Sequence, residues 1–351
     1  MKERKFGFGI IGAGTISEVH AEAINAIPHA KLYGVYSINK NKSQLFAAKH
    51  NCMAYDSLDD LLNVDEIDIV CICTPSGIHL EPAIKCIEAG KHCVIEKPLE
   101  VTLEKCDRII AAADMAGVKT AVIFPSRFYA ASMQVKKAID EKRFGDLVLG
   151  DAIVKWYRSE AYYQSAAWRG TWALDGGGAL MNQGIHSVDL LQWYMGDVES
   201  VQAVSANVKH KTIEVEDTVV ATLQFANGAL GTIECSTAVF PGALKRIEIM
   251  GTAGTAILEE SNLIQWQFEK DADEDEQIIK NMSGGSVSHG GVSNPADISF
   301  AGHQLQLEDM MHAIETGAKP MIDARDGRKS VAIVLAIYES ARTGKKFNCK
   351  R

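Results

Sequence analysis

Residues 96–98 place a carboxylate, an amine and a proline directly after a predicted buried strand, residues 92–95. In an open α/β sheet, ligands bind beyond the carboxyl ends of the strands, so Glu96 and Lys97 would stand at the mouth of a site. A lysine amine in that position can accept or return the proton of an alcohol that is oxidised to a ketone. The alternative is a solvated Glu-Lys pair, which is the more common use of such a tripeptide.

A glycine-rich turn follows the first predicted strand, residues 6–11, and precedes a helix that reaches about residue 26. Gly12 permits the tight turn of a dinucleotide-binding motif, and Gly14 lets a pyrophosphate approach the backbone. The small residue Ser17 stands where a third glycine is usual. The free N–H groups at the helix N-terminus favour phosphate. The turn therefore predicts a nicotinamide dinucleotide site at the start of a βαβ unit.

The end of the second predicted strand, residues 31–37, is expected to choose between NAD and NADP. An acid usually binds the adenosine ribose there, but this chain has Ser37 followed by Lys40 and Lys42. These residues predict that NADP is accepted and favoured over NAD, whereas the alternative is an ordinary polar loop. The residues expected to bind the cofactor are Gly12, Gly14, Thr15, Ile16, Ser37, Asn39, Lys42, Thr74, Pro75, His79, Glu96 and Lys97.

A second polar constellation lies in the predicted helix 179–195, after three consecutive glycines. Asn182, His186 and Asp189 are spaced four and three residues apart, so they share one helix face. His186 could exchange a proton, with Asp189 orienting its ring. The alternative is a hydrogen-bonded core histidine, which is the more common role on a largely apolar helix.

The stretch 156–172 is unusually rich in aromatic residues and arginine. Tyr162, Tyr163 and Trp168 offer flat faces to a sugar ring, and Arg158 and Arg169 offer forked donors to a carboxylate or phosphate. This content predicts a sugar or polyol with an anionic group, such as a nucleotide-linked sugar. The alternative is that the aromatic rings anchor a long loop. The residues expected to bind substrate are Arg158, Tyr163, Trp168, Arg169, Asn182 and His186.

The elements that must position these residues form two patterns. Strands alternate with helices up to residue 124, which predicts a parallel, doubly wound sheet with residues 12, 74 and 97 on one edge. Beyond it, long strands with glycine turns predict a large, mostly antiparallel open sheet. We therefore expect a dinucleotide-binding Rossmann domain at 1–124 and an α+β domain for substrate binding and oligomerisation at 125–351. The acidic run 269–276 is predicted to be a solvated loop or strand rim.

The composition narrows the functional class. A net charge of -9 argues against a general nucleic-acid binder, and no apolar run approaches the length of a membrane helix. The N-terminus lacks the apolar region of a signal peptide. The eight cysteines are scattered without a Cys-x-x-Cys pair, so we expect no metal site and a reducing, cytoplasmic location.

Taken together, these motifs resemble the Gfo/Idh/MocA oxidoreductases over nearly the whole chain. The likeness rests on residues 9–17, Thr74-Pro75 with His79, residues 96–98 and the run 176–189. It implies that Lys97 and His186 are the catalytic lysine and histidine, and that the chain forms a homodimer or homotetramer through its second sheet. Many members carry Asp where this chain has Asn182, so a positioning role is expected for this amide. The peptide bond before Pro98 is a candidate for the cis form.

The predicted activity is NAD(P)-dependent hydride transfer between the nicotinamide and a secondary alcohol or ketone of a sugar, polyol or sugar derivative. Two alternatives come from relatives of other classes. One is a glycosidase that uses the cofactor catalytically, and the other is a sugar-binding regulator without activity. The presence of Glu96, Lys97 and His186 counts against the regulator.

Overall fold

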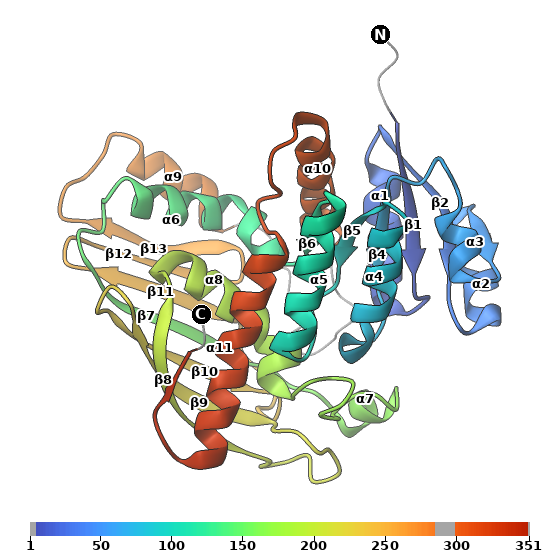
Figure 1. Ribbon diagram of the computed structural model, residues 1–351. Coiled ribbons are helices and arrows are strands. Elements are labelled where there is room, and N and C mark those ends of the chain that lie inside the picture. The colour runs from blue at the N-terminus through green and yellow to red at the C-terminus, as the bar shows by residue number, and fades with distance from the viewer. Residues whose placement is uncertain (1–4, 285–298, 350–351) are drawn as a thin grey trace. The chain divides into compact units, whose positions relative to one another are not determined.

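The computed structural model describes residues 5–284 and 299–349 (Figure 1). They fall into two compact units. Unit 1 contains the described residues up to Pro125 together with Ser299–Arg328, and unit 2 contains those that begin at Ser126 together with those that begin at Lys329. The division next to Pro125 lies beside the boundary predicted from the sequence.

The core of unit 1 is a six-stranded sheet in which every pairing is parallel, with the order β3-β2-β1-β4-β5-β6. The Rossmann prediction is therefore confirmed. Short apolar runs form the central strands, and all residues of β1, β4 and β6 are buried. The strands are β1 (Phe6–Ile11), β2 (Ala30–Tyr36), β3 (Met53–Tyr55), β4 (Ile69–Ile72), β5 (His92–Ile95) and β6 (Thr120–Val122).

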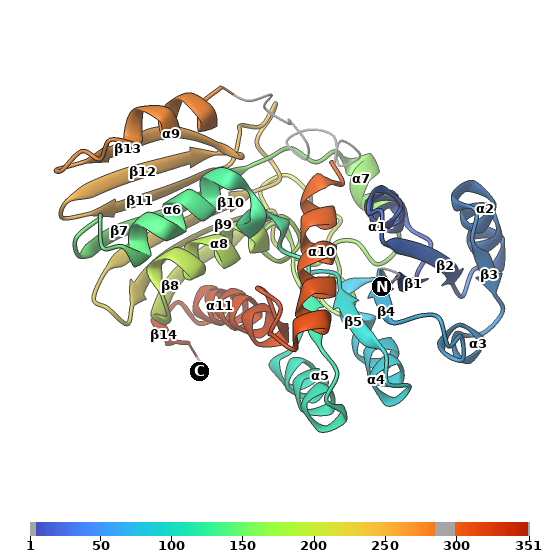
Figure 2. The same cartoon turned by 90° about the horizontal axis from the view of Figure 1, so that it is seen from above.

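Helices cover both faces of this sheet, with α4 and α5 side by side on one face and α1 beside α10 on the other (Figure 2). Capping residues mark the ends of α5. The Thr102 side chain caps its N-terminus, and Gly117 ends the helix in the left-handed region at φ 67°. The helices are α1 (Thr15–Ala26), α2 (Lys40–His50), α3 (Leu58–Leu62), α4 (Leu80–Glu88), α5 (Leu103–Ala116) and α10 (Ala301–Thr316).

The place of α10 differs from the predicted domain range, which put the whole of 125–351 in the second domain. Leu307, Met310 and Met311 pack in the same apolar cluster as the β1 residue Phe6. The side chain of Gln306 also accepts the Phe124 N–H at 3.0 Å. Apolar burial and this hydrogen bond place residues 299–328 in the Rossmann unit, although they follow seven of the eight strands of the second sheet in the sequence.

Unit 2 is built on an eight-stranded sheet with the order β13-β12-β11-β7-β10-β9-β8-β14. Only the β7–β10 pairing is parallel, so the prediction of a mostly antiparallel sheet is confirmed. The strands are β7 (Leu147–Lys155), β8 (Val198–Ala206), β9 (Thr218–Phe225), β10 (Leu230–Ser236), β11 (Arg246–Gly251), β12 (Gly254–Glu259), β13 (Asn262–Phe268) and β14 (Phe347–Asn348).

One face of this sheet is covered by helices, and α8 packs on β7 and β11 (Figure 2). On the other face, the apolar residues Val204, Val220 and Leu230 are 74%, 50% and 56% exposed. Assembly through this face stays a prediction. The helices of unit 2 are α6 (Ala130–Asp140), α7 (Glu160–Gln164), α8 (Ile185–Met195) and α9 (Asp275–Met282), and α11 (Ala324–Thr343) begins in unit 1 and ends in unit 2.

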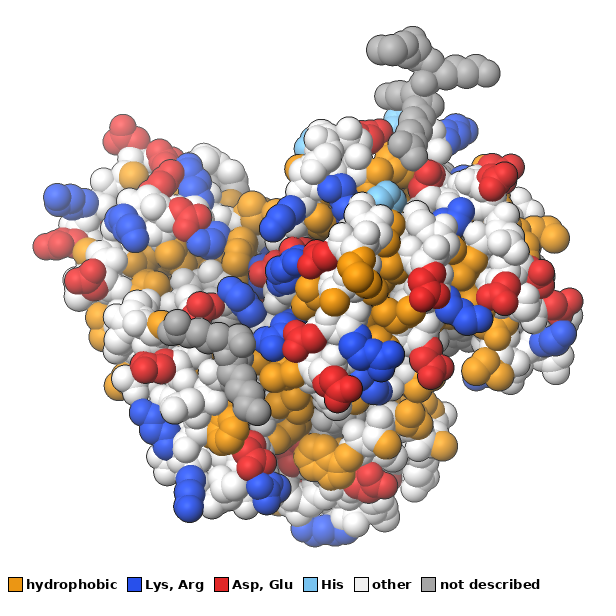
Figure 3. Space-filling model, viewed as in Figure 1, with side chains coloured by type: hydrophobic (Ala, Val, Ile, Leu, Met, Phe, Trp, Pro, Cys, Tyr) orange, Lys and Arg blue, Asp and Glu red, His pale blue; other side chains and the backbone are white. Residues whose placement is uncertain are grey.

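The surface seen in Figure 3 intersperses acidic and basic side chains and shows no broad basic patch, in keeping with the net charge of -9. Among the described residues, no helix combines the length and the apolar character needed to cross a membrane.

Candidate active site

Three loops that follow adjacent strands form one edge of the Rossmann sheet. Gly12 follows β1, Thr74 follows β4 and Lys97 follows β5, and the register of these strands places their ends together. Lys97 is partly exposed, whereas Glu96 and Pro98 on either side of it are buried. The structure thus brings together the three strand ends that the sequence pattern placed on one edge.

The turn between β1 and α1 fits a dinucleotide. Gly12 has φ 103°, and a Cβ there would lie 2.6 Å from the Cys73 carbonyl oxygen, so this position requires glycine. A Cβ at Gly14 would meet nothing within 4 Å, which leaves space at the start of α1 for a phosphate group. Thr15 and Ile16 form the first turn of α1, where free N–H groups would face that phosphate.

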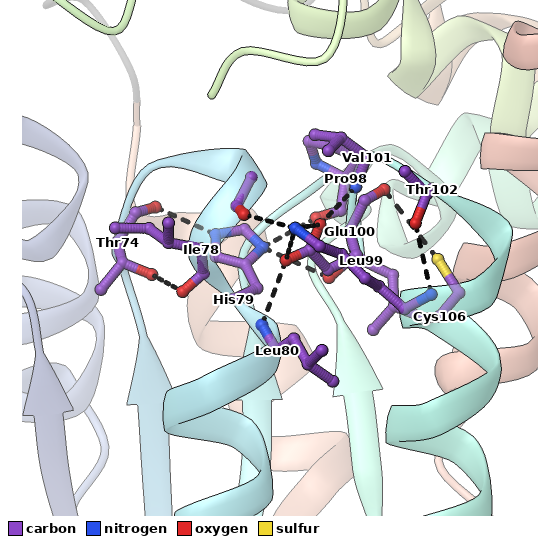
Figure 4. A network of polar contacts seen from close by, with 12 residues as sticks. Thr74, Ile78, His79, Leu80, Pro98, Leu99, Glu100, Val101, Thr102 and Cys106 are labelled. Carbon is purple, nitrogen blue, oxygen red and sulfur yellow. Dashed lines mark hydrogen bonds and ion pairs between the residues drawn. The ribbon is translucent and has the colours of Figure 1, made fainter. Parts of the chain in front are cut away.

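A buried histidine joins the loop after β4 to the loop after β5 (Figure 4). The ring of His79 is 0% exposed; Nε2 lies 2.9 Å from the Thr74 carbonyl oxygen and Nδ1 lies 2.9 Å from that of Pro98. The buried carboxylate of Glu100 supports the same loop by accepting the main-chain N–H groups of Leu80 and Val101. His79 therefore links the two loops from the interior of unit 1. The peptide bond between Lys97 and Pro98 is cis, as the sequence predicted.

Glu96 is 5% exposed and lies between two buried histidines that sequence analysis did not select. Its Oε1 lies 2.9 Å from His20 Nε2 on α1 and 3.5 Å from His303 Nε2 on α10. Burial would raise the pKa of Glu96, but the hydrogen bond from His20 and the nearby His303 ring outweigh it and hold the pKa well below its usual value. Burial lowers the pKa of His20 despite Glu96, so His20 donates to an ionised carboxylate as a neutral ring.

The loop after β2 is organised by its own hydrogen bonds. Ser37 Oγ accepts the Asn39 N–H at 3.3 Å, and Asn39 Oδ1 caps α2 by accepting the Lys42 N–H at 3.1 Å. The amine of Lys40 pairs with Asp56 at 2.6 Å, whereas the Lys42 side chain is exposed. Of the two lysines considered for a 2′-phosphate, Lys42 is therefore the better placed to bind it.

In unit 2, a π-helical turn, Ala179–Gly184, connects the triple glycine to α8 and carries Asn182. Position 178 requires glycine, because a Cβ there would lie 1.7 Å from the main-chain carbonyl oxygen of Glu216. The Glu216 carboxylate accepts the N–H groups of Gly178 and Leu180 and the hydroxyl of Tyr338. Burial raises the pKa of Glu216 to about 7, although these three donors act in the opposite direction.

Asn182 belongs to a chain of polar contacts within unit 2. Its amide nitrogen donates to Asp175 Oδ1 at 2.5 Å, and its oxygen accepts the Gln183 amide at 2.7 Å. Gln183 also donates to the Tyr162 hydroxyl at 3.0 Å, and Arg169 donates to the same hydroxyl at 2.6 Å. The amide of Asn182 is thus fixed in one orientation, as suits a group that positions substrate.

The predicted substrate residues of the aromatic stretch divide into buried and accessible ones. Arg158 is 2% exposed and donates to the Tyr157 carbonyl and to Gln183, and Tyr163 is 8% exposed with its hydroxyl 2.7 Å from Thr237 Oγ1. Their burial and these hydrogen bonds favour the packing alternative, and a substrate contact by either side chain stays a prediction. Trp168 and Arg169 are partly exposed, and the guanidinium lies 4.7 Å from the indole centroid.

His186 lies in the first turn of α8 and is partly exposed. The same helix carries Asp189, whose two carboxylate oxygens accept hydrogen bonds from Arg127 at 2.8 and 2.6 Å. The orientation of the His186 ring by Asp189 stays a prediction, and so does the catalytic role of His186.

A parallel Rossmann unit with a glycine turn that fits a dinucleotide, followed by a large open sheet, is typical of NAD-binding oxidoreductases. The family model for the NAD-binding Rossmann fold of an oxidoreductase family matches residues 6–124, and the GFO/IDH/MocA C-terminal domain model matches residues 132–257. The chain therefore belongs to the GFO/IDH/MocA oxidoreductase family.

Its relatives include sugar and polyol dehydrogenases. The WlbA dehydrogenase from Bordetella pertussis, solved in complex with NADH and UDP-GlcNAcA, is 34% identical with a TM-score of 0.89 and aligns over 100% of this chain and 99% of its own. Myo-inositol 2-dehydrogenase from Thermotoga maritima is 29% identical over 70% of this chain and 73% of its own length. Glucose-6-phosphate 3-dehydrogenase from Bacillus subtilis is 30% identical over 58% of this chain and 59% of its own length.

Proposed function

We propose that this enzyme is an NAD-dependent dehydrogenase that oxidises a secondary alcohol of a nucleotide-linked sugar acid. The observation that carries the proposal is the likeness, over the full chain, to a dehydrogenase solved with NADH and UDP-GlcNAcA. The partly exposed Arg169 of unit 2 supports it, because an acidic sugar needs a cationic partner. An anionic sugar is also the substrate that the aromatic stretch predicted.

In the proposed reaction, the residues of the chain bind the sugar and handle the proton. When bound, the nicotinamide accepts the hydride of the carbinol carbon. Lys97 takes the hydroxyl proton as the carbonyl forms, and in the reverse direction its ammonium returns that proton. His186 hydrogen-bonds to the sugar hydroxyls as a second proton-handling group. Asn182, fixed by Asp175 and Gln183, orients a further hydroxyl without exchanging a proton.

We assign the anionic group of the substrate to Arg169. Its guanidinium lies 4.3 Å from the Tyr162 ring centroid and donates to the Tyr162 hydroxyl, so its plane is held in place. A partly exposed, planar guanidinium suits a carboxylate. This arrangement favours Arg169 over the buried Arg158 as the charge-recognising residue.

A substrate panel tests this function. We expect UDP-GlcNAcA to be oxidised with net formation of NADH, and UDP-GlcNAc and myo-inositol to be much poorer substrates. Arg169→Met should lower kcat/KM for the acid by about tenfold to a hundredfold, the value of a charged hydrogen bond of about 1.5–3 kcal/mol. The matched control is Arg342→Met, which removes an exposed arginine of α11 that pairs with Glu339.

The opposite results separate the alternatives. Efficient oxidation of myo-inositol that Arg169→Met leaves unchanged would identify a neutral-polyol dehydrogenase and contradict the anionic substrate. Turnover of a glycoside without net NADH formation would identify a glycosidase that recycles its cofactor.

We propose that NADP is accepted beside NAD, through the exposed Lys42. The predicted preference for NADP rests on the absence of an acidic residue after β2. Two observations support NAD instead: Lys40 pairs with Asp56, and the WlbA dehydrogenase was solved with NADH. We expect Kd values for the two cofactors within about tenfold of each other, and we expect Ser37→Asp to weaken NADP by at least about tenfold through charge repulsion. Titration with NADH and NADPH by fluorescence measures both. Wild-type binding of NAD more than tenfold tighter than NADP would show that Lys42 is merely solvated.

A further inference from the structure

The main chain of Lys97 is held from both sides by buried groups. On one side its N–H donates to Glu96 Oε2 at 3.2 Å. On the other side the carbonyl oxygen of Pro98 lies 2.9 Å from the ring of His79, which is 0% exposed. The partly exposed Lys97 side chain therefore leaves from a segment whose orientation is fixed by interior residues.

The second carboxylate oxygen of Glu96 ties this segment to two helices. His20 comes from α1, the helix whose N-terminus fits the cofactor phosphates, and His303 comes from α10, which follows more than 200 residues later in the chain. The rings of His20 and His303 meet edge to face, with centroids 5.1 Å apart. Glu96 thus links the cofactor-binding helix, α10 and the peptide of Lys97.

Glu96 contributes a negative charge to this cluster. Glu96 is ionised beside the neutral ring of His20, so the residue that directly precedes Lys97 carries a buried negative charge within 3.2 Å of the Lys97 main-chain nitrogen. Besides His20 and His303, the titratable groups that face Glu96 are the thiols of Cys71 and Cys73, and burial raises the pKa of both, so they stay neutral. His20 and the two thiols therefore supply no full positive charge to the carboxylate.

We propose that Glu96, clamped by His20 and His303, is a positioning residue that fixes the Lys97 peptide and retains a proton on the Lys97 amine through its negative charge. This inference rests on the proposed function, in which Lys97 exchanges the substrate proton. Glu96 acts only through Lys97 and touches neither substrate nor nicotinamide in this scheme.

A metal site is the competing interpretation of the same three residues. One ligand atom from each of His20, Glu96 and His303 lies within 4.8 Å of the others. A histidine that binds a metal almost always donates its second ring N–H to a neighbour. Among the described residues, Nδ1 of His20 and Nδ1 of His303 have no hydrogen-bond partner, so the outer shell that a metal centre needs is missing. The geometry favours a clamp around a carboxylate.

The reactivity of the Lys97 amine tests the proposal without any substrate. The full-length variants Glu96→Gln, Glu96→Asp and His303→Phe are labelled with trinitrobenzenesulfonate at several pH values, and mass spectrometry follows Lys97 against the exposed Lys85. Only the neutral amine reacts, so a shift of half a pH unit in its titration changes the rate by about threefold at fixed pH. We expect at least this acceleration in Glu96→Gln, a smaller one in His303→Phe and near wild-type labelling in Glu96→Asp.

The matched control is His312→Phe, an exposed histidine on the same helix α10, which should label like the wild type. Wild-type labelling profiles in folded Glu96→Gln and His303→Phe would overturn the proposal, as would one equivalent of zinc or nickel retained by the purified protein and lost in His303→Phe. Altered labelling of Lys97 together with no oxidation of any sugar would support the clamp and contradict the proposed function, so the two failures are distinguishable.

Discussion

Replacement of Lys97 by methionine is expected to abolish turnover while the protein still binds NADH. Methionine has a similar length and fits a partly exposed position, so the change removes the amine and little else. Loss of a general acid–base group costs about 10²–10⁴ in rate. The Kd for NADH should stay within about threefold, because the phosphate contacts lie at the turn after β1. Steady-state kinetics and fluorescence titration measure the two effects separately.

The control for this variant is Lys85→Met on α4, which removes an exposed amine that pairs with Asp59 at 3.0 Å. It should retain full activity. His186→Ala should also be strongly impaired, and the Lys97 and His186 losses should be less than additive if both groups serve one proton transfer. A Lys97→Met enzyme with near wild-type kcat would refute the assignment of the proton transfer to this lysine.

The Rossmann unit was predictable because the signals for its strands, helices and turns lie in short, continuous stretches of the sequence. The first strand, for example, is a short apolar run, and a helix follows it directly in the sequence. Gly12 marks the tight turn between the two. The return of α10 to this unit was not predictable in the same way. Leu307 and Met310 are apolar positions that any core would accept, and the choice between two cores depends on tertiary packing.

The candidate site shows the same limit. The motif around Lys97 was visible, but the two histidines that surround Glu96 lie about 80 and 200 residues from it in sequence. The one available signal was that His20 falls on the buried face of α1, where an imidazole needs a partner. Spacing alone could not tell that Glu96 is that partner.

Polar residues near the surface of unit 2 were the hardest to interpret. Arg158 and Tyr163 were predicted to contact substrate, but spacing alone could not show that they also bond to Gln183 and Thr237, which are distant in sequence. The acidic run 269–276 was expected to be solvated throughout, yet Asp275 begins α9 and pairs with Arg143 at 2.6 Å, and this pairing lowers its pKa to about 2.

Breaking the buried pair between Arg127 and Asp189 is expected to destabilise unit 2 strongly. Both side chains are nearly inaccessible, at 1% and 0% exposed, and the guanidinium binds the carboxylate through two hydrogen bonds. Removal of one partner leaves an uncompensated buried charge, which costs about 3–5 kcal/mol. Asp189→Asn should therefore lower the free energy of unfolding of unit 2 by about this amount.

Tryptophan fluorescence during urea unfolding measures this loss, because all five tryptophans of the chain lie in unit 2. The control Asp197→Asn breaks an exposed pair with Lys329 and should cost about 1 kcal/mol or less. The double variant Arg127→Met with Asp189→Leu removes both charges and should recover much of the lost stability, since apolar residues of similar volume can replace a buried ion pair. A double variant that is as unstable as Asp189→Asn would show instead that the hydrogen-bonded geometry itself holds α8, the helix that carries His186.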